Sequence, residues 1–175
     1  MKRKSIFLLI IISITLLVGY RFIKASRFIC PIKYKGDIVV RCDGRGEGFF
    51  AAGRSGGRLH NGLDLYAKVG TPVLASRYAR VLKAGQNRGM GKFVVLRHWG
   101  GYTTVYGHLD KVYVKRHQRV MQGQVIGTVG KTGNARYSNI EPHLHFELKK
   151  NGKPQDPLKS IEEVKFGNKQ VVTSN

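Results

Sequence analysis

Acidic residues are scarce in this chain of 175 residues: 10 Asp and Glu stand against 31 Lys and Arg, and the formal net charge is +21. A surface with this balance attracts polyanions. Nucleic acid is not indicated as the partner, because no helix-turn-helix, RRM or zinc-finger pattern accompanies the charge. The charge predicts an anionic environment, and wall polymers or lipid headgroups are the candidates if the chain is exported.

Cysteine is nearly absent, with Cys30 and Cys42 the only two. They form no CxxC pair, which argues against a cysteine-based zinc site. In an oxidising compartment we expect a disulfide between them, with two free thiols as the alternative. Glycine is abundant at 22 residues but follows no G-x-y period, which excludes collagen and predicts frequent tight turns.

Apolar residues at helical spacing are also rare. Short runs rich in β-branched and aromatic residues alternate with glycine turns instead, which predicts a mainly β protein with an antiparallel sandwich or barrel. Segments 69–75 and 121–127 resemble each other as a turn that leads into an apolar strand. The expected strands are 37–40, 72–74, 79–84, 93–97, 103–106, 112–114 and 125–129.

The N-terminus differs from the rest of the chain. Lys2, Arg3 and Lys4 precede an apolar stretch over 6–18, which continues to Ile23 with one charge. The stretch is shorter than the about 20 residues of a typical spanning helix. We expect a membrane-anchor helix over 1–24, with a cleaved signal peptide as the alternative; either way the body is exported to the cell envelope.

The remainder divides into three parts. We expect a stalk over 25–39, one folded domain over 40–158 and a polar C-terminal tail over 159–175. One short helical turn and little further order are expected in the tail. With the anchor, this organisation predicts a monomeric single-pass membrane protein whose domain lies outside the cytoplasm.

Two of the six histidines occur in the segment Glu141-Pro-His-Leu-His-Phe-Glu147. In a strand, the i, i+2 spacing of His143 and His145 places both imidazoles on one face, about 7 Å apart, while the residues between them point to the core. One can bind a metal while the other acts as acid or base, but the spacing does not choose between them. Glu147 shares this face, either orienting a ligand or lying on the surface.

His60 and Asp64 bracket a turn at Asn61-Gly62. Together with the downstream His-x-His they supply the three protein ligands of a catalytic zinc, which leaves a fourth position for water. His108 ends the strand predicted over 103–106, a usual position for a functional side chain. The remaining two, His98 and His117, are expected to be solvated surface residues.

These segments in order resemble the LytM/lysostaphin-type zinc peptidases, peptidase family M23, over about Val40 to Pro157. The matching pieces are His60-x3-Asp64, Tyr106-Gly-His-Leu109 and Pro142-His-Leu-His-Phe-Glu147, supported by Gly70-Thr-Pro-Val73, Gly123-Gln-Val-Ile-Gly127 and Gly130-Lys-Thr-Gly133.

The resemblance implies a barrel-sandwich hybrid fold (a duplicated hybrid motif). It also implies zinc bound by His60, Asp64 and His145, with His108 and His143 beside a metal-activated water and the scissile carbonyl. The implied activity is hydrolysis of peptide cross-bridges in bacterial peptidoglycan. The alternative is a non-catalytic binding module that regulates another cell-wall hydrolase. Such a module is expected to have lost ligands or catalytic histidines, and all five are present here.

The segment 134–141 departs from the short Gly/Ser-rich lead that is common in the family. It lines the expected substrate groove, so the sequence does not determine which peptidoglycan bond is cut.

Overall fold

The computed structural model describes residues 6–7, 10–16, 27–161 and 171–173. The strands are β1 (Ile38–Val40), β2 (Cys42–Asp43), β3 (Gly46–Glu47), β4 (Gly53–Arg54), β5 (Arg58–Leu59), β6 (Leu63–Tyr66), β7 (Pro72–Leu74), β8 (Ala79–Asn87), β9 (Gly91–Arg97), β10 (Tyr102–Val112), β11 (Arg119–Val120), β12 (Val125–Val129), β13 (His143–Lys150), β14 (Lys153–Gln155) and β15 (Val171–Thr173). A 3-10 helix, η1 (Gly133–Arg136), and a short helix, α2 (Pro157–Ser160), complete the domain.

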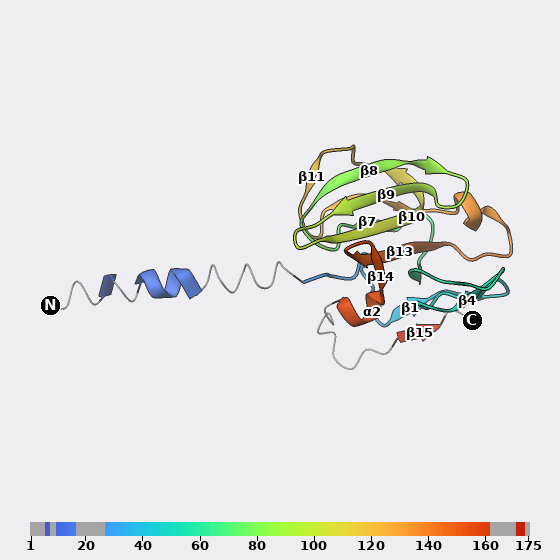
Figure 1. Cartoon of the computed structure of the whole chain (residues 1–175), viewed down its shortest axis with the longest axis horizontal. Coiled ribbons are helices and arrows are strands. Elements are labelled where there is room, and N and C mark those ends of the chain that lie inside the picture. The colour runs from blue at the N-terminus through green and yellow to red at the C-terminus, as the bar shows by residue number, and fades with distance from the viewer. Residues whose placement is uncertain (1–5, 8–9, 17–26, 162–170, 174–175) are drawn as a thin grey trace.

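Most strands join one 11-stranded sheet in the order β11-β8-β9-β10-β13-β6-β1-β15, while β12 pairs with β10 and β7, and β14 pairs with β13. Among the described strands, every pairing is antiparallel except that of β1 with β15. Figure 1 shows β8, β9 and β10 on one side of β13, with β1, β4 and β15 on the other. The mainly β, antiparallel prediction is therefore confirmed.

Strand β13 lies near the middle of this sheet and is buried on both faces. Leu144, Phe146 and Leu148 point into the core, and none is more than 1% exposed. Because side chains alternate along a strand, His143, His145 and Glu147 share the opposite face. The core packing of one face thus fixes the direction of the histidines on the other.

Several predicted elements match the structure closely. The strands over 72–74 and 125–129 have the expected bounds, and they belong to the two segments that look alike. These strands, β7 and β12, pair with each other. The strand predicted over 112–114 is wrong, because β10 ends at Val112.

The N- and C-terminal predictions fare differently. Residues 10–16 are helical, and within the described residues no helix has the length and apolar character to cross a membrane. The rest of the predicted anchor over 1–24, apart from residues 6–7, lies outside the described residues. At the other end, 171–173 pairs with β1. The expectation of little order after the helical turn is therefore wrong for that strand.

The predicted disulfide is also wrong. Cys30 and Cys42 both lie in the described part of the chain, and no disulfide joins them there. Cys30 is buried in the core beside Ile32, and burial raises the pKa of its thiol to about 11, which keeps it protonated and unreactive. Because Phe28, Cys30 and Ile32 are all buried, this part of the predicted stalk belongs to the folded domain.

Candidate metal and active site

Pairing of β6 with β13 creates the site. Asp64 on β6 lies directly opposite His145 on β13, and His60 enters from the turn just before β6. Gly62, between His60 and Asp64, makes this approach possible. A Cβ at Gly62 would lie 2.6 Å from the backbone oxygen of Phe146 and 3.0 Å from Cε1 of His145.

Three donor atoms converge at this point. The Nδ1 atom of His145 lies 2.8 Å from Oδ1 of Asp64 and 3.1 Å from Nε2 of His60, and that Nε2 lies 3.1 Å from the same Oδ1. All three side chains are buried. Within the described residues these are the His, Cys, Asp and Glu groups arranged closely enough to hold a metal ion.

The outer nitrogen of each histidine in this group is held by a further contact. His60 donates from Nδ1 to the backbone oxygen of Phe49 at 2.8 Å, which leaves Nε2 as the unprotonated atom facing the centre. His145 donates from Nε2 to Oε1 of Glu147 at 3.2 Å. Glu147 is buried, so it orients His145 and is not the surface residue of the alternative interpretation.

Two arginines hold the opposite oxygen of Asp64. Oδ2 accepts from Nη2 of Arg41 at 3.1 Å and from Nη2 of Arg54 at 3.2 Å. Arg41 also donates to Oδ1 of Asp43 at 2.5 Å, and Oδ2 of Asp43 accepts from the backbone amide of Glu141 at 3.0 Å. The carboxylate of Asp64 is therefore fixed on both sides, with Oδ1 turned toward the histidines.

Sequence analysis missed Arg41 and Arg54. They precede Asp64 by 23 and 10 residues and come from different hairpin segments, so no spacing rule connects them to it. Burial raises the pKa of Asp64, but its close contacts with His145 and His60 outweigh this and hold that pKa well below its ordinary value. Burial lowers the pKa of His145, and its hydrogen bonds to Asp64 and Glu147 raise it to about 9.

His108 and His143 lie beside this group, with their ring centroids 4.8 Å apart. His108 donates from Nδ1 to the backbone oxygen of Thr132 at 2.9 Å, and His143 donates from Nδ1 to that of Glu141 at 2.7 Å. Nε2 is therefore the unprotonated atom in both rings. Burial and the nearby His143 and His145 lower the pKa of His108 to about 3, and burial also lowers that of His143. Both are neutral at pH 7.

The backbone of His108 is strained. Its φ of 62° lies in the left-handed region, and it falls within the irregular stretch of β10 between Tyr106 and Leu109. A hydrogen bond from its amide to the backbone oxygen of Met90, at 2.7 Å, holds this conformation. Strained conformations of this kind concentrate at functional sites.

An open cleft runs over these residues. His60, Asp64, His108, His143 and His145 all line it. The lining also includes four arginines and, from other segments, Gly89, Met90, Asn134, Ala135 and Ile140. The structure thus brings together all five residues singled out in the sequence.

A sequence model of peptidase family M23 matches residues 58–157. The chain belongs to this family.

Similar proteins include a bacterial lipoprotein and a peptidoglycan endopeptidase. The M23 chain is 40% identical over 108 residues to the lipoprotein NlpD/LppB homolog of Pseudomonas aeruginosa, covering 61% of this chain and 35% of that protein. It is 42% identical over 100 residues to the peptidoglycan DD-endopeptidase ShyC of Vibrio cholerae, covering 57% and 22%. The chain thus spans about a fifth to a third of the length of these relatives.

A solved structure supports the same fold. A zinc containing peptidase from Vibrio cholerae superposes with a TM-score of 0.62 and 30% identity, covering 75% of this chain and 39% of that one.

The other two histidines of this M23 chain lie outside the site. His117 is exposed, as predicted. His98 is buried, so its assignment to the surface is wrong: Nδ1 lies 3.0 Å from the backbone oxygen of Tyr78 and Nε2 lies 2.8 Å from Oγ1 of Thr104. The adjacent Trp99-Gly-Gly turn is exposed, but alternation along β9 turns His98 inward.

Proposed function

We propose that this protein is a zinc-dependent endopeptidase that hydrolyses the peptide cross-bridges of bacterial peptidoglycan. His60, Asp64 and His145 are the proposed metal ligands, and His108 and His143 are the proposed catalytic residues. The observation that carries the proposal is the convergence of three donor atoms beside two neutral imidazoles in one open cleft. Membership of peptidase family M23 supports it.

The donor set fits zinc. Two imidazole nitrogens and one carboxylate oxygen are borderline-to-hard ligands, and three protein ligands are typical of catalytic zinc sites. The outer atoms of all three side chains are already bound to Phe49, Glu147 and the two arginines, so the inner atoms are preorganised. When bound, zinc acidifies water and polarises an amide carbonyl.

His143 and His108 perform the proton transfers in this proposal. Their Nε2 atoms carry no proton, because the Nδ1 protons are donated to Glu141 and Thr132. One imidazole accepts the proton of the attacking water. Once protonated, an imidazole donates a hydrogen bond to the developing oxyanion or a proton to the leaving amine.

The cleft is suited to an anionic peptide. Arg45 and Arg58 line it and are exposed, whereas its acidic residues, Asp64 and Glu147, are already bound to basic side chains. Peptidoglycan stem peptides carry free carboxylates. ShyC, a relative, is named as a peptidoglycan endopeptidase, which supports the same substrate class.

The proposal also covers location and fold. We place the protein in the cell envelope as a monomer with a barrel-sandwich hybrid domain over 40–158. Attachment through the apolar N-terminal segment stays a prediction.

Purified protein tests the function directly. We expect about one zinc per chain by atomic absorption, and cleavage of cross-linked muropeptides into monomers by mass spectrometry. A zinc-loaded protein that leaves peptidoglycan intact contradicts the proposal. If it also stimulates a separate cell-wall hydrolase, the alternative of a regulatory module is supported.

A further inference from the structure

The single tryptophan of the chain stands at the tip of the β9–β10 hairpin. Trp99 is 87% exposed. Gly100 and Gly101 follow it with φ values of 79° and 76°, which form a tight turn and leave the indole without packing partners on that side. An aromatic side chain this exposed, on a short and well-ordered hairpin, indicates a contact surface.

Two basic side chains brace this tip. Arg77 donates from Nη2 to the backbone oxygen of Trp99 at 2.6 Å. Lys150 donates from Nζ to the backbone oxygen of Gly100 at 2.5 Å and lies 4.0 Å from the centroid of the Tyr102 ring. The backbone of the hairpin tip is therefore held in place by two cationic side chains.

A row of basic residues crosses the sheet next to the tip. Strand register places Arg119 opposite Arg80, Arg80 opposite Arg97, Arg97 opposite Thr103 and Thr103 opposite Lys149. Directly paired residues point to the same face, with strands about 4.8 Å apart. The three arginines of the row are exposed.

These three arginines lack counter-charges. Like charges directly opposite each other destabilise a sheet. Lys149 is paired with Glu147 at 2.8 Å, but within the described residues no ion pair includes Arg80, Arg97 or Arg119. An external anion would relieve this repulsion, so the row is suited to a negatively charged partner.

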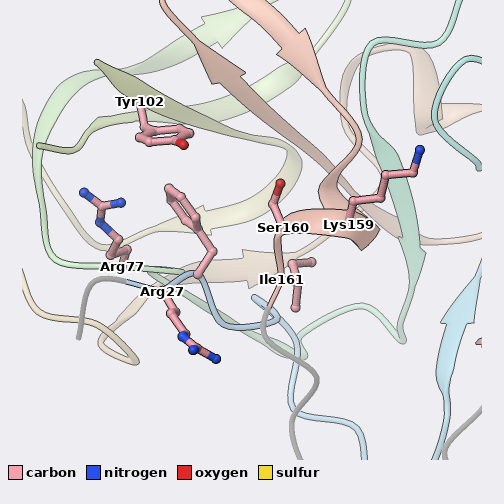
Figure 2. A pocket seen from close by; sticks show the side chains of 7 residues that line it. Arg27, Arg77, Tyr102, Lys159, Ser160 and Ile161 are labelled. Carbon is pink, nitrogen blue, oxygen red and sulfur yellow. The ribbon is translucent and has the colours of Figure 1, made fainter. Parts of the chain in front are cut away.

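A pocket opens beside the same hairpin. Figure 2 shows Tyr102 and Arg77 on one side of it and Ser160 and Ile161 on the other. Arg27 and Lys159 also line it, so three of the lining residues are basic. The lining therefore offers cations and a hydroxyl, the groups that bind a phosphate, and Arg77 connects this pocket to the backbone of Trp99.

The segment around Phe28 also packs at this end of the domain. Phe28 bridges to Ile161, and its ring contacts His98 and Tyr102 at centroid distances of 5.2 and 5.3 Å. Residues 10–16 form an apolar helix whose isoleucines are all exposed. The chain between Leu16 and Arg27 spans at most about 40 Å, so the apolar helix is tethered to the domain at this end.

We infer that this end of the domain docks on an anionic membrane surface. Trp99, Arg80, Arg97, Arg119 and Lys150 make up this surface, which we name the Trp99 face, and the buried Arg77 supports it from below. Indole rings prefer the headgroup region of a bilayer, and basic residues bind its phosphates. The nearby apolar helix favours a bilayer over a soluble polyanion. The candidate active site lies at the opposite end of β13, so docking directs the cleft away from the membrane.

The fluorescence of Trp99 tests this inference in the full chain, because no other tryptophan contributes. The chain is reconstituted into vesicles of phosphatidylcholine alone, or with about one third phosphatidylglycerol. With the anionic lipid we expect emission at shorter wavelength and quenching by brominated lipids. In about 1 M salt, where the screening length is only about 3 Å, the shift is lost.

Matched variants separate the Trp99 face from overall charge. Arg80→Gln/Arg97→Gln abolishes the shift. Lys68→Gln/Arg88→Gln removes the same amount of charge at the other end of the sheet, just after β6 and just before β9. This variant is expected to retain the shift in emission. Both variants are first confirmed to be folded by circular dichroism. Identical emission in the two vesicle types contradicts the inference. So does a shift in vesicle-free poly(glycerol phosphate) that exceeds the one in anionic vesicles, which assigns this face to a phosphodiester polymer.

Discussion

Arg41 and Asp64 form an ion pair inside the domain, with Nη2 3.1 Å from Oδ2 and both side chains only 5% exposed. The other oxygen of Asp64, Oδ1, lies 2.8 Å from Nδ1 of His145 and 3.1 Å from Nε2 of His60. Arg54, which is more exposed, contacts the same Oδ2 from the other hairpin. The metal-facing carboxylate is thus oriented by charges that the sequence motif does not contain.

Arg54→Gln is predicted to weaken zinc binding without unfolding the protein. Removal of one partner that orients a ligand typically lowers metal affinity about 10- to 100-fold. A competition titration with a zinc chelator measures the loss. Arg45→Gln removes a neighbouring exposed arginine that does not contact Asp64, and should bind zinc like the unmodified protein. Equal affinities in the two variants would show that Arg54 does not orient the ligand.

Arg41→Gln is predicted to be more damaging. Because Arg41 is buried and joins Asp64 to Asp43, its loss removes a charged partner from each carboxylate and leaves Arg54 as the arginine that still binds Asp64. Breaking a buried pair in this way costs about 3 kcal/mol or more. Chemical denaturation measures the free energy of unfolding. Stability within about 0.5 kcal/mol of the unmodified protein, the size of a surface substitution, would contradict this prediction.

The histidines are predicted to separate metal binding from catalysis. His108→Ala should retain zinc and lose activity by about 100- to 10,000-fold, the usual contribution of a proton-transfer group. His145→Ala should lose both zinc and activity. Zinc content and muropeptide cleavage are measured on the same samples. A His108→Ala protein with full activity would remove this residue from the mechanism, while His117→Ala, at an exposed position, serves as the neutral control.

Gly62→Ala is predicted to disrupt the site through the backbone. A Cβ here meets the backbone oxygen of Phe146 at 2.6 Å, so β6 and β13 must move apart. We expect a stability loss of about 1–3 kcal/mol and weaker zinc binding. Gly53→Ala, where nothing lies within 4 Å of the new atom, is the matched control. Thermal unfolding and zinc titration are measured for both variants. Equal stability and equal zinc affinity in the two would contradict the prediction.

Acid is predicted to destabilise the zinc-free protein through His98. Burial lowers its pKa to about 4, from an unfolded value of 6.5. The unfolded state therefore binds more protons below pH 6.5, so the stability present above that pH falls between 6.5 and about 4, by about 3 kcal/mol from this residue. Denaturation curves in this range measure it. His98→Gln should flatten the dependence, and an unchanged slope would contradict the assignment.

The sequence predicted most of the sheet and the centre of the site, for a physical reason. Alternation of apolar residues fixed which side of β13 carries His143 and His145, because one face must be buried. His98 was misplaced because its glycine-rich neighbours dominate the local pattern, although alternation would have turned it inward. The contacts of Arg41 and Arg54 with Asp64 depend on long-range packing and have no local signal. The pairing of 171–173 with β1 also joins segments that are distant in the sequence, so no local pattern predicts it.

The proposed ligands are distant along the chain, since 81 residues separate Asp64 from His145. They meet only when β6 and β13 pair, so a newly made or partly folded chain has no assembled site. If the proposed function holds, that activity arises only on completion of folding. The topology of the sheet would then prevent the protein from acting before its domain is complete.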